Sequence, residues 1–197
     1  MYKSLGVGIL IGVLGTFIGL HVCDLGQSDE DRQNELIAKY YATESATLVS
    51  PHNIRERLSH GKDNFVLVDV RAEEDYQREH IVGAINIDTG RALDGVLADF
   101  TELVAANPNK EIIIYCYSAA CMNGRKAGNF LAENDVYVKE LTVGWNEWRY
   151  GWEMWNYDNE WDTHKVEDYV VSGAEPGILD PSLESIAPCP IDGDLSC

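Results

Sequence analysis

Hydrophobic residues follow two alternating patterns along the chain between residues 47 and 158. Short apolar runs rich in β-branched residues predict buried strands at 65–70, 85–87, 112–115 and 136–141. Apolar residues at helical spacing, with capping residues before them, predict helices over 51–58, 72–79, 93–106, 124–133 and 145–150. Continuous apolar strands between helices are typical of an α/β fold with a central parallel sheet flanked by helices. Reactive groups in such sheets lie at the carboxyl ends of the strands, where Cys116 stands.

The N-terminal segment 4–23 contains no charged residue and is about long enough to cross a bilayer as a helix. Lys3 precedes this segment and acidic residues follow it, which places the N-terminus in the cytosol and the domain in the periplasm or outside. We expect residues 1–27 to form a single transmembrane anchor or a signal segment. A retained anchor, a cleaved signal peptide and a lipoprotein at Cys23 are the three processing outcomes. The anchor is preferred because no small-x-small cleavage site directly follows the apolar core.

Residues 28–46 are expected to form a helical connector between this segment and the domain. Ser28 can cap the helix, because the acidic residues directly after it suit a helix N-terminus. Leu36, Ile37 and Tyr40 fall on one face. That stripe predicts that the connector packs on the domain or links it to the membrane.

Residues 159–197 are rich in Gly, Pro, Ser and acidic residues, which predicts an extended, partly ordered acidic tail. Cys189 and Cys197 lie in this tail and can pair as a disulfide in an oxidising compartment.

The overall charge is strongly negative, with 33 Asp+Glu against 15 Lys+Arg and a net charge of −18. Such a surface repels phosphate backbones and anionic lipid headgroups. We therefore expect no nucleic-acid partner. No metal or other cofactor is expected, because no partners at metal-ligand spacing accompany His21, His52, His60 and His164.

Three motifs occur in order across residues 47–152: VLVDVRAEEDYQREHIVGAINI at 66–87, IIIYCYSAACMNGRKAGNFL at 112–131 and VGWNEWRYG at 143–151. Together they resemble the signatures of the rhodanese-like domain (sulfurtransferase) family, in the subtype with two cysteines in the active-site loop. The resemblance implies a rhodanese-like domain over 47–158. Three positions depart from the pattern of the family. Glu79 replaces the usual glycine, Val82 a frequent proline and Val143 a glycine, and these departures concern the local geometry of turns rather than the fold.

The resemblance implies that Cys116 is the nucleophile and that the loop after it binds the substrate through Tyr117, Ser118, Ala119, Ala120, Cys121 and Met122. A thiol attacks only as the thiolate, which positive potential favours. A loop of small residues before a helix can turn its backbone N–H groups inward and add to the helix dipole. Sulfane sulfur would then pass from thiosulfate or a persulfide donor to Cys116, and from there to a thiol or an acceptor protein.

The loop also bears on which anions the site accepts. Related phosphatases and arsenate reductases carry an arginine five residues after the nucleophile, where this chain has Cys121. The first basic residues are Arg125 and Lys126, beyond the loop, so phosphate-ester hydrolysis is not expected and thiosulfate should bind poorly.

Three further residues lie in the first motif. In the family, the residues matching Asp69 and Arg71 brace the site. In this chain two roles of Asp69 and Arg71 are equally open, support of the active-site loop and a plain structural ion pair. His80 is expected to have a structural role.

Three functions remain open. The favoured one is an exported, membrane-tethered sulfurtransferase that uses Cys116. The second is a thiol–disulfide redox protein that uses Cys116 and Cys121, and the third is a catalytically silent rhodanese-like binding module. Cys121 either resolves the persulfide, forms a reversible disulfide with Cys116, or is inert.

Overall fold

The computed structural model describes residues 28–156 and 164–183. The described residues fall into two units, one up to Glu44 and one from Ser45 onward. The predicted transmembrane segment 4–23 and the predicted pair Cys189 and Cys197 lie outside the described residues. Among the residues that are described, no helix combines the length and the apolar character that a membrane crossing requires.

A sheet of five parallel strands forms the centre of the second unit, with the spatial order β1-β6-β5-β2-β4. These strands are β1 (Leu48–Val49), β2 (Phe65–Asp69), β4 (Ile85–Asn86), β5 (Glu111–Tyr115) and β6 (Lys139–Leu141). β2 and β5 pair along their whole length, from Phe65 opposite Glu111 to Asp69 opposite Tyr115. The carboxyl ends of these two strands therefore meet at one edge, directly before Cys116.

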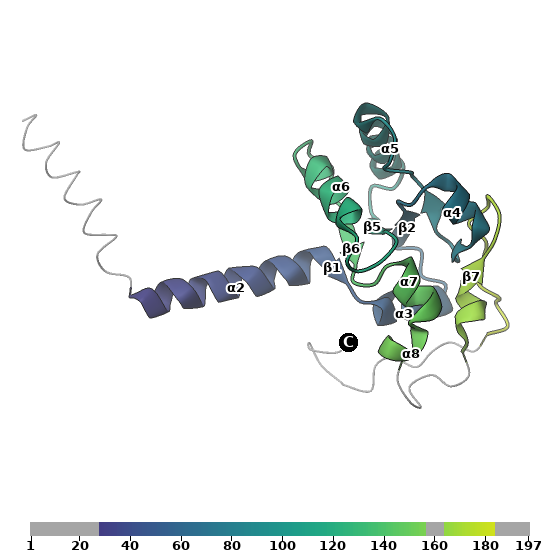
Figure 1. The fold of residues 1–197 in the computed structure, drawn as a ribbon, viewed down its shortest axis with the longest axis horizontal. Helices are drawn as coiled ribbons and strands as arrows, with labels where there is room; N and C mark the ends of the chain where they lie inside the picture. The colour runs from purple at the N-terminus through teal and green to yellow at the C-terminus, as the bar shows by residue number, and fades with distance from the viewer. Residues whose placement is uncertain (1–27, 157–163, 184–197) are drawn as a thin grey trace, which may run out of the picture. The chain divides into compact units, whose positions relative to one another are not determined.

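Helices cover both faces of the sheet, which confirms the predicted α/β architecture (Figure 1). On one face lie α5 (Leu93–Ala106) and α6 (Met122–Ala132), over the buried side chains Val68, Ile112 and Ile114. On the other lie α3 (Pro51–Ser59) and α7 (Trp145–Tyr150), over Leu67, Ile113 and Tyr115. Alternate residues of β5 enter opposite cores, so a continuous apolar run is required at this position.

Two element boundaries differ by two residues or more from the sequence-based expectation. The strand expected at 136–141 is only Lys139–Leu141, because Asp135 has a φ of 60° and pairing with β5 begins at Lys139, opposite Ile113. Helix α6 begins at Met122 rather than at residue 124, with Cys121 as its N-cap. Four strands have only two residues, too few for a periodicity to identify: β1, β3 (His80–Ile81), β4 and β7 (Val170–Val171). Of these, only β4 lies within an expected strand, at 85–87.

The C-terminal segment 164–183 departs from the expected extended tail, because it packs on the domain. Its short helix η1 (Val166–Tyr169) leads into β7, which pairs antiparallel with β3. Tyr169 is fully buried against Trp148 and Trp152, the latter in α8 (Trp152–Trp155). The aromatic ring is part of the core that α7 covers, so the folded domain extends beyond residue 158.

Most of helix α2 (Asp29–Thr47) belongs to the first unit. Ser28 caps it as predicted, since the Ser28 Oγ accepts a hydrogen bond from the Asp31 amide at 3.0 Å. The predicted apolar stripe is exposed to solvent, with exposed fractions of 68% for Leu36, 49% for Ile37 and 56% for Tyr40.

Candidate active site

Cys116 follows the last residue of β5 and lies at the carboxyl edge of the central sheet. Its side chain belongs to the same core as Ile112 and Ile114, on the face covered by α6, and the residue is only 4% exposed. The Cys116 carbonyl accepts a hydrogen bond from the Trp145 amide at 2.8 Å. The strand thus ends at a buried sulfur whose backbone is held by the start of α7.

The structure joins Cys116 to Cys121 in a disulfide, across a Cα–Cα distance of 6.2 Å. Cys121 is half-buried and stands at the N-cap of α6, whereas Cys116 is buried in the core. Cys121 is therefore the more exposed residue of the pair. A thiolate formed at Cys121 would also have a helix N-terminus beside it, which favours the ionised form.

Two of the loop amides make hydrogen bonds within the protein. The Ala119 amide donates to Glu147 Oε2 at 3.0 Å, and the Cys121 amide donates to the Ser118 carbonyl at 2.9 Å. Within the described part of the chain, the amides of Tyr117, Ser118 and Ala120 have no hydrogen-bond acceptor. One loop amide is thus held by a carboxylate, and three make no hydrogen bond within the described residues.

Gly144 allows α7 to approach the loop closely. A Cβ at this position would lie 2.2 Å from the Ser118 Cα and 2.3 Å from the Ser118 nitrogen. The φ of Gly144 is −96°, which is open to any residue, so space alone demands glycine here. Its amide also donates to Glu147 Oε2, at 2.9 Å, so one carboxylate holds both the loop and the start of the helix. Sequence reasoning did not identify Glu147, although a glutamate three residues after a helix N-cap is a recognised capping signal.

Asp69 and Arg71 form a buried ion pair, with Arg71 Nη2 at 2.6 Å from Asp69 Oδ2. Burial alone would lower the pKa of the Arg71 guanidinium, but its hydrogen bond and charge interaction with Asp69 outweigh burial and raise it. The guanidinium carbon lies 4.5 Å from the Trp145 ring centroid and 5.8 Å from that of Tyr117. The guanidinium therefore lies against aromatic rings of the loop and of α7, and its charge is already neutralised by Asp69.

Tyr117 ties the loop to the segment that follows β2. Its hydroxyl donates to Asp75 Oδ2 at 2.7 Å and accepts from the Ala72 amide at 3.3 Å. Burial, followed by the bond to Asp75, raises the pKa of Tyr117, and that same bond lowers the pKa of Asp75. Asp75 and Glu147 are thus carboxylates bonded to the loop, an arrangement that disfavours a dianionic ligand.

The histidine and the tryptophans of the motifs make structural contacts. His80 is fully buried, contacts the Tyr76 carbonyl through Nδ1 at 2.8 Å and stacks on the Tyr76 ring. Trp145, Trp148 and Trp152 are buried in the core on the α3 and α7 side of the sheet. None of these side chains is needed to explain chemistry at Cys116.

Comparisons with known proteins identify the family of the domain. Residues 50–150, just over half of the chain, match the family model described as Rhodanese-like domain. An 83-residue stretch is 39% identical to the HTH-type transcriptional regulator Rv0324 of Mycobacterium tuberculosis. That stretch is 42% of this chain and 34% of the regulator, so the chain spans about a third of the length of that relative.

Two solved structures are similar to the chain. The BH2092 protein of Bacillus halodurans is 28% identical with a TM-score of 0.50, over 59% of this chain and 80% of that one. The rhodanese-like domain of the Anabaena Alr3790 protein is 18% identical with a TM-score of 0.39, over 50% of this chain and 68% of that one.

Proposed function

The chain belongs to the rhodanese-like domain family, and we propose that within it the protein is a sulfurtransferase of the subtype with two loop cysteines. Cys116 would accept sulfane sulfur and Cys121 would resolve the persulfide. The observation that carries this proposal is the disulfide between the two residues. It supports a site in which a sulfur atom on Cys116 lies within reach of a second thiol.

The proposed reaction has two branches after a common first step. The Cys116 thiolate attacks the outer sulfur of a persulfide R–S–SH, forming Cys116–S–SH and releasing R–S⁻. An acceptor thiolate then takes the outer sulfur and regenerates the Cys116 thiolate. Alternatively, the Cys121 thiolate attacks the inner sulfur, which forms the Cys116–Cys121 disulfide and releases HS⁻. Two external thiols reduce that disulfide and leave as their own disulfide.

We expect the donor to be a persulfide of a thiol rather than thiosulfate. The carboxylates of Asp75 and Glu147 are bonded to the loop, and Arg71 is neutralised by Asp69. Arg125, on the first turn of α6, is paired with a carboxylate of its own. A dianion entering this site would meet negative charge that these cations do not compensate.

The experiment is an intact-mass measurement on the reduced full-length protein, exposed separately to glutathione persulfide and to thiosulfate. Cys121→Ser should gain one sulfur from the persulfide, and Cys116→Ser should gain none. The unmodified chain should lose two hydrogens and release sulfide. A Cys116→Ser variant that still gains sulfur, or a Cys121→Ser variant that gains none, would reject sulfur transfer at Cys116.

Thiol–disulfide exchange is the second candidate, and the greater exposure of Cys121 favours it. In this function an external thiolate attacks the Cys121 sulfur and Cys116 is the leaving group. Oxidation of a dithiol substrate by the protein, with no sulfide released in the mass experiment, would support exchange over sulfur transfer. A chain inert in both assays would be a binding module.

We also propose that the protein is exported and tethered through residues 4–23, with the domain in the periplasm or outside. The uncharged segment and the charge difference across it support this proposal. Protease added to intact spheroplasts of a bacterial host should digest the domain, and alkaline carbonate should leave the protein with the membranes. A domain protected until lysis would contradict export.

A further inference from the structure

Glu140 provides a carboxyl on the strand next to β5, close to Cys116. Glu140 lies on β6, and it pairs in register with Ile114 of β5. Residues opposite one another on parallel strands point to the same face, and side chains alternate along a strand. Glu140 and Cys116 are therefore on the same face of the sheet, the face that α6 covers.

Gly124 of α6 brings these two groups to one small space. A Cβ at this position would lie 3.1 Å from Glu140 Oε1 and 3.8 Å from the Cys116 Cβ. Gly124 is itself buried. Any larger residue would fill the space between the carboxyl and the cysteine.

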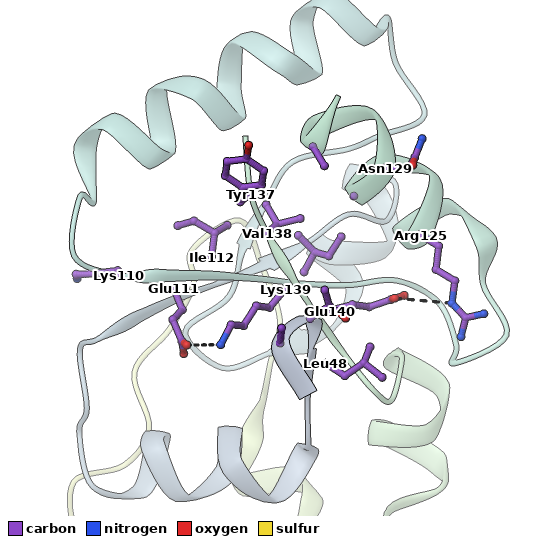
Figure 2. Close-up of a pocket in the computed structure, with 16 residues that line it drawn as sticks. Leu48, Lys110, Glu111, Ile112, Arg125, Asn129, Tyr137, Val138, Lys139 and Glu140 are labelled. Carbon is purple, nitrogen blue, oxygen red and sulfur yellow. Dashed lines mark hydrogen bonds and ion pairs between the residues drawn. The ribbon is translucent and has the colours of Figure 1, made fainter. Parts of the chain in front are cut away.

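A cavity of about 590 Å³ adjoins the carboxyl (Figure 2). Glu140, Gly124 and Arg125 line it together with Ile112 and Ile114 of the sheet. Figure 2 shows Glu140 extending toward Arg125, whose Nε lies 3.8 Å from Glu140 Oε2. One carboxyl oxygen thus adjoins the space shared with Cys116, and the other faces a partly exposed arginine beside the cavity.

The environment of Glu140 suits proton exchange with a thiol. Burial raises the pKa of Glu140, and the charge of Arg125 offsets this only in part. Asp75 differs, because the hydrogen bond from Tyr117 lowers its pKa and holds that carboxyl ionised. A carboxyl whose pKa moves toward that of a thiol accepts and returns the proton of the thiol more readily.

Asp94 and Glu102 of α5 are exposed at the surface, and most other charged groups on the elements around this space have partners. On the strands and on α5, α6 and α7 these are Glu111 with Arg57 and Lys139, Asp69 with Arg71, Asp99 with Arg91, Glu133 with Asn129, and Glu147 with the Ala119 and Gly144 amides. Asp75 of α4 (Glu73–Arg78) is bonded to the Tyr117 hydroxyl. Lys126 of α6 lines a different cavity. Glu140 is therefore the carboxyl placed to exchange a proton with Cys116.

We propose that Glu140 is the proton partner of Cys116, an inference that rests on the sulfur-transfer function proposed above. Before transfer, the Cys116 thiol gives its proton to the Glu140 carboxylate, and the resulting thiolate attacks the donor persulfide. When an external thiolate opens the disulfide at Cys121, Cys116 departs as a thiolate and takes the proton back from the Glu140 carboxyl. In both directions the cavity connects the carboxyl with solvent.

The test is the titration of the Cys116 thiolate by its ultraviolet absorbance in the full-length Cys121→Ser protein. Subtracting the curve of the Cys116→Ser/Cys121→Ser double variant removes the other cysteines. Adding Glu140→Gln should lower the thiol pKa by about 1 to 2 pH units, because it removes a negative charge near the thiol in a partly buried site. The carboxyl and the thiol should titrate as a coupled pair with Glu140 present, and the thiol should titrate in a single step without it.

Glu133→Gln is the matched control, because Glu133 is an exposed carboxyl next to the C-terminal end of the same helix. It should leave the thiol pKa unchanged. Gly124→Ala is a second variant, which displaces the Glu140 carboxyl without removing its charge, and it should also lower the thiol pKa. Identical titration curves with Glu140 and with Glu140→Gln would overturn the proposal.

The two proposals fail in different ways. If Cys121→Ser gains no sulfur from glutathione persulfide while its titration still responds to Glu140→Gln, sulfur transfer is rejected and the coupling of the two groups stands. If it gains sulfur while the titration curves coincide, the role of Glu140 alone is rejected.

Discussion

Replacing Gly144 with alanine tests how far the reactivity of Cys116 depends on the close approach of α7 to the loop. The added Cβ would lie 2.2, 2.3 and 2.5 Å from the Cα, nitrogen and carbonyl carbon of Ser118. Unbonded carbon atoms prefer separations of about 3.5 to 4.0 Å, so the overlap exceeds about 1 Å. All three contacts are backbone atoms, and no side-chain rotation relieves them. The loop or the start of α7 must therefore shift by about 1 Å.

The shift should affect both rate and stability. A misplacement of about 1 Å typically slows a positioned reaction by about 100-fold. Overpacking of this kind costs about 1 to 3 kcal/mol of unfolding free energy. The displaced loop also strains the hydrogen bonds from the Ala119 and Gly144 amides to Glu147. We expect slower sulfur loading of Cys116 and a lower urea midpoint from one substitution.

The assay combines timed intact-mass measurements of sulfur loading, in the Cys121→Ser background, with urea unfolding. Gly128→Ala is the control, since Gly128 lies inside α6 and its Cβ would make an ordinary contact, 3.8 Å from a Val138 methyl. Alanine there should stabilise the helix by up to about 1 kcal/mol and leave loading unchanged. Loading by Gly144→Ala within about twofold of the parent would refute the reasoning, because the loop would then not depend on this contact.

Further predictions concern stability around the site. Asp69→Asn leaves the Arg71 guanidinium buried without its counter-charge and should lower the unfolding free energy by about 3 to 5 kcal/mol in urea titrations, whereas a loss under about 1 kcal/mol would contradict a buried pair. Tyr115→Phe removes the buried hydroxyl that accepts the Ile81 amide at 3.2 Å, and it should cost about 1 to 3 kcal/mol in the same assay. Burial raises the pKa of Glu140, so the folded state holds this proton more tightly than the unfolded state. The tighter binding of this proton contributes to the free energy of unfolding in full below about pH 4.3, and the contribution is lost as the pH rises through the folded pKa of Glu140. The urea midpoint should therefore decrease as the pH rises from about 4.3 through the folded pKa of Glu140. The decrease should be smaller in Glu140→Gln, which has no carboxyl to titrate.

The strands and helices beside the site could be predicted because their local patterns are strong. The runs in β2 and β5 are apolar on both sides, as a strand covered on both faces requires, and each ends where a polar or reactive residue begins. The position of Cys116 at a strand end followed from this pattern. The sequence pattern did not predict the boundaries of β6, which depend on a turn at Asp135. It also did not predict that residues 164–183 pack on the domain, which depends on the burial of Tyr169.

The sequence by itself determined the α/β class, the order of the main elements and the loop that carries the two cysteines, because each has a signal within a few neighbouring residues. Only the tertiary structure decided which carboxylates meet that loop. Glu147 reaches Ala119 because Gly144 lets α7 approach, and Glu140 reaches the side of Cys116 through strand register and Gly124. Such contacts join residues far apart in the chain. The spacing of hydrophobic residues along a strand or a helix, which reflects only near neighbours, therefore does not predict them.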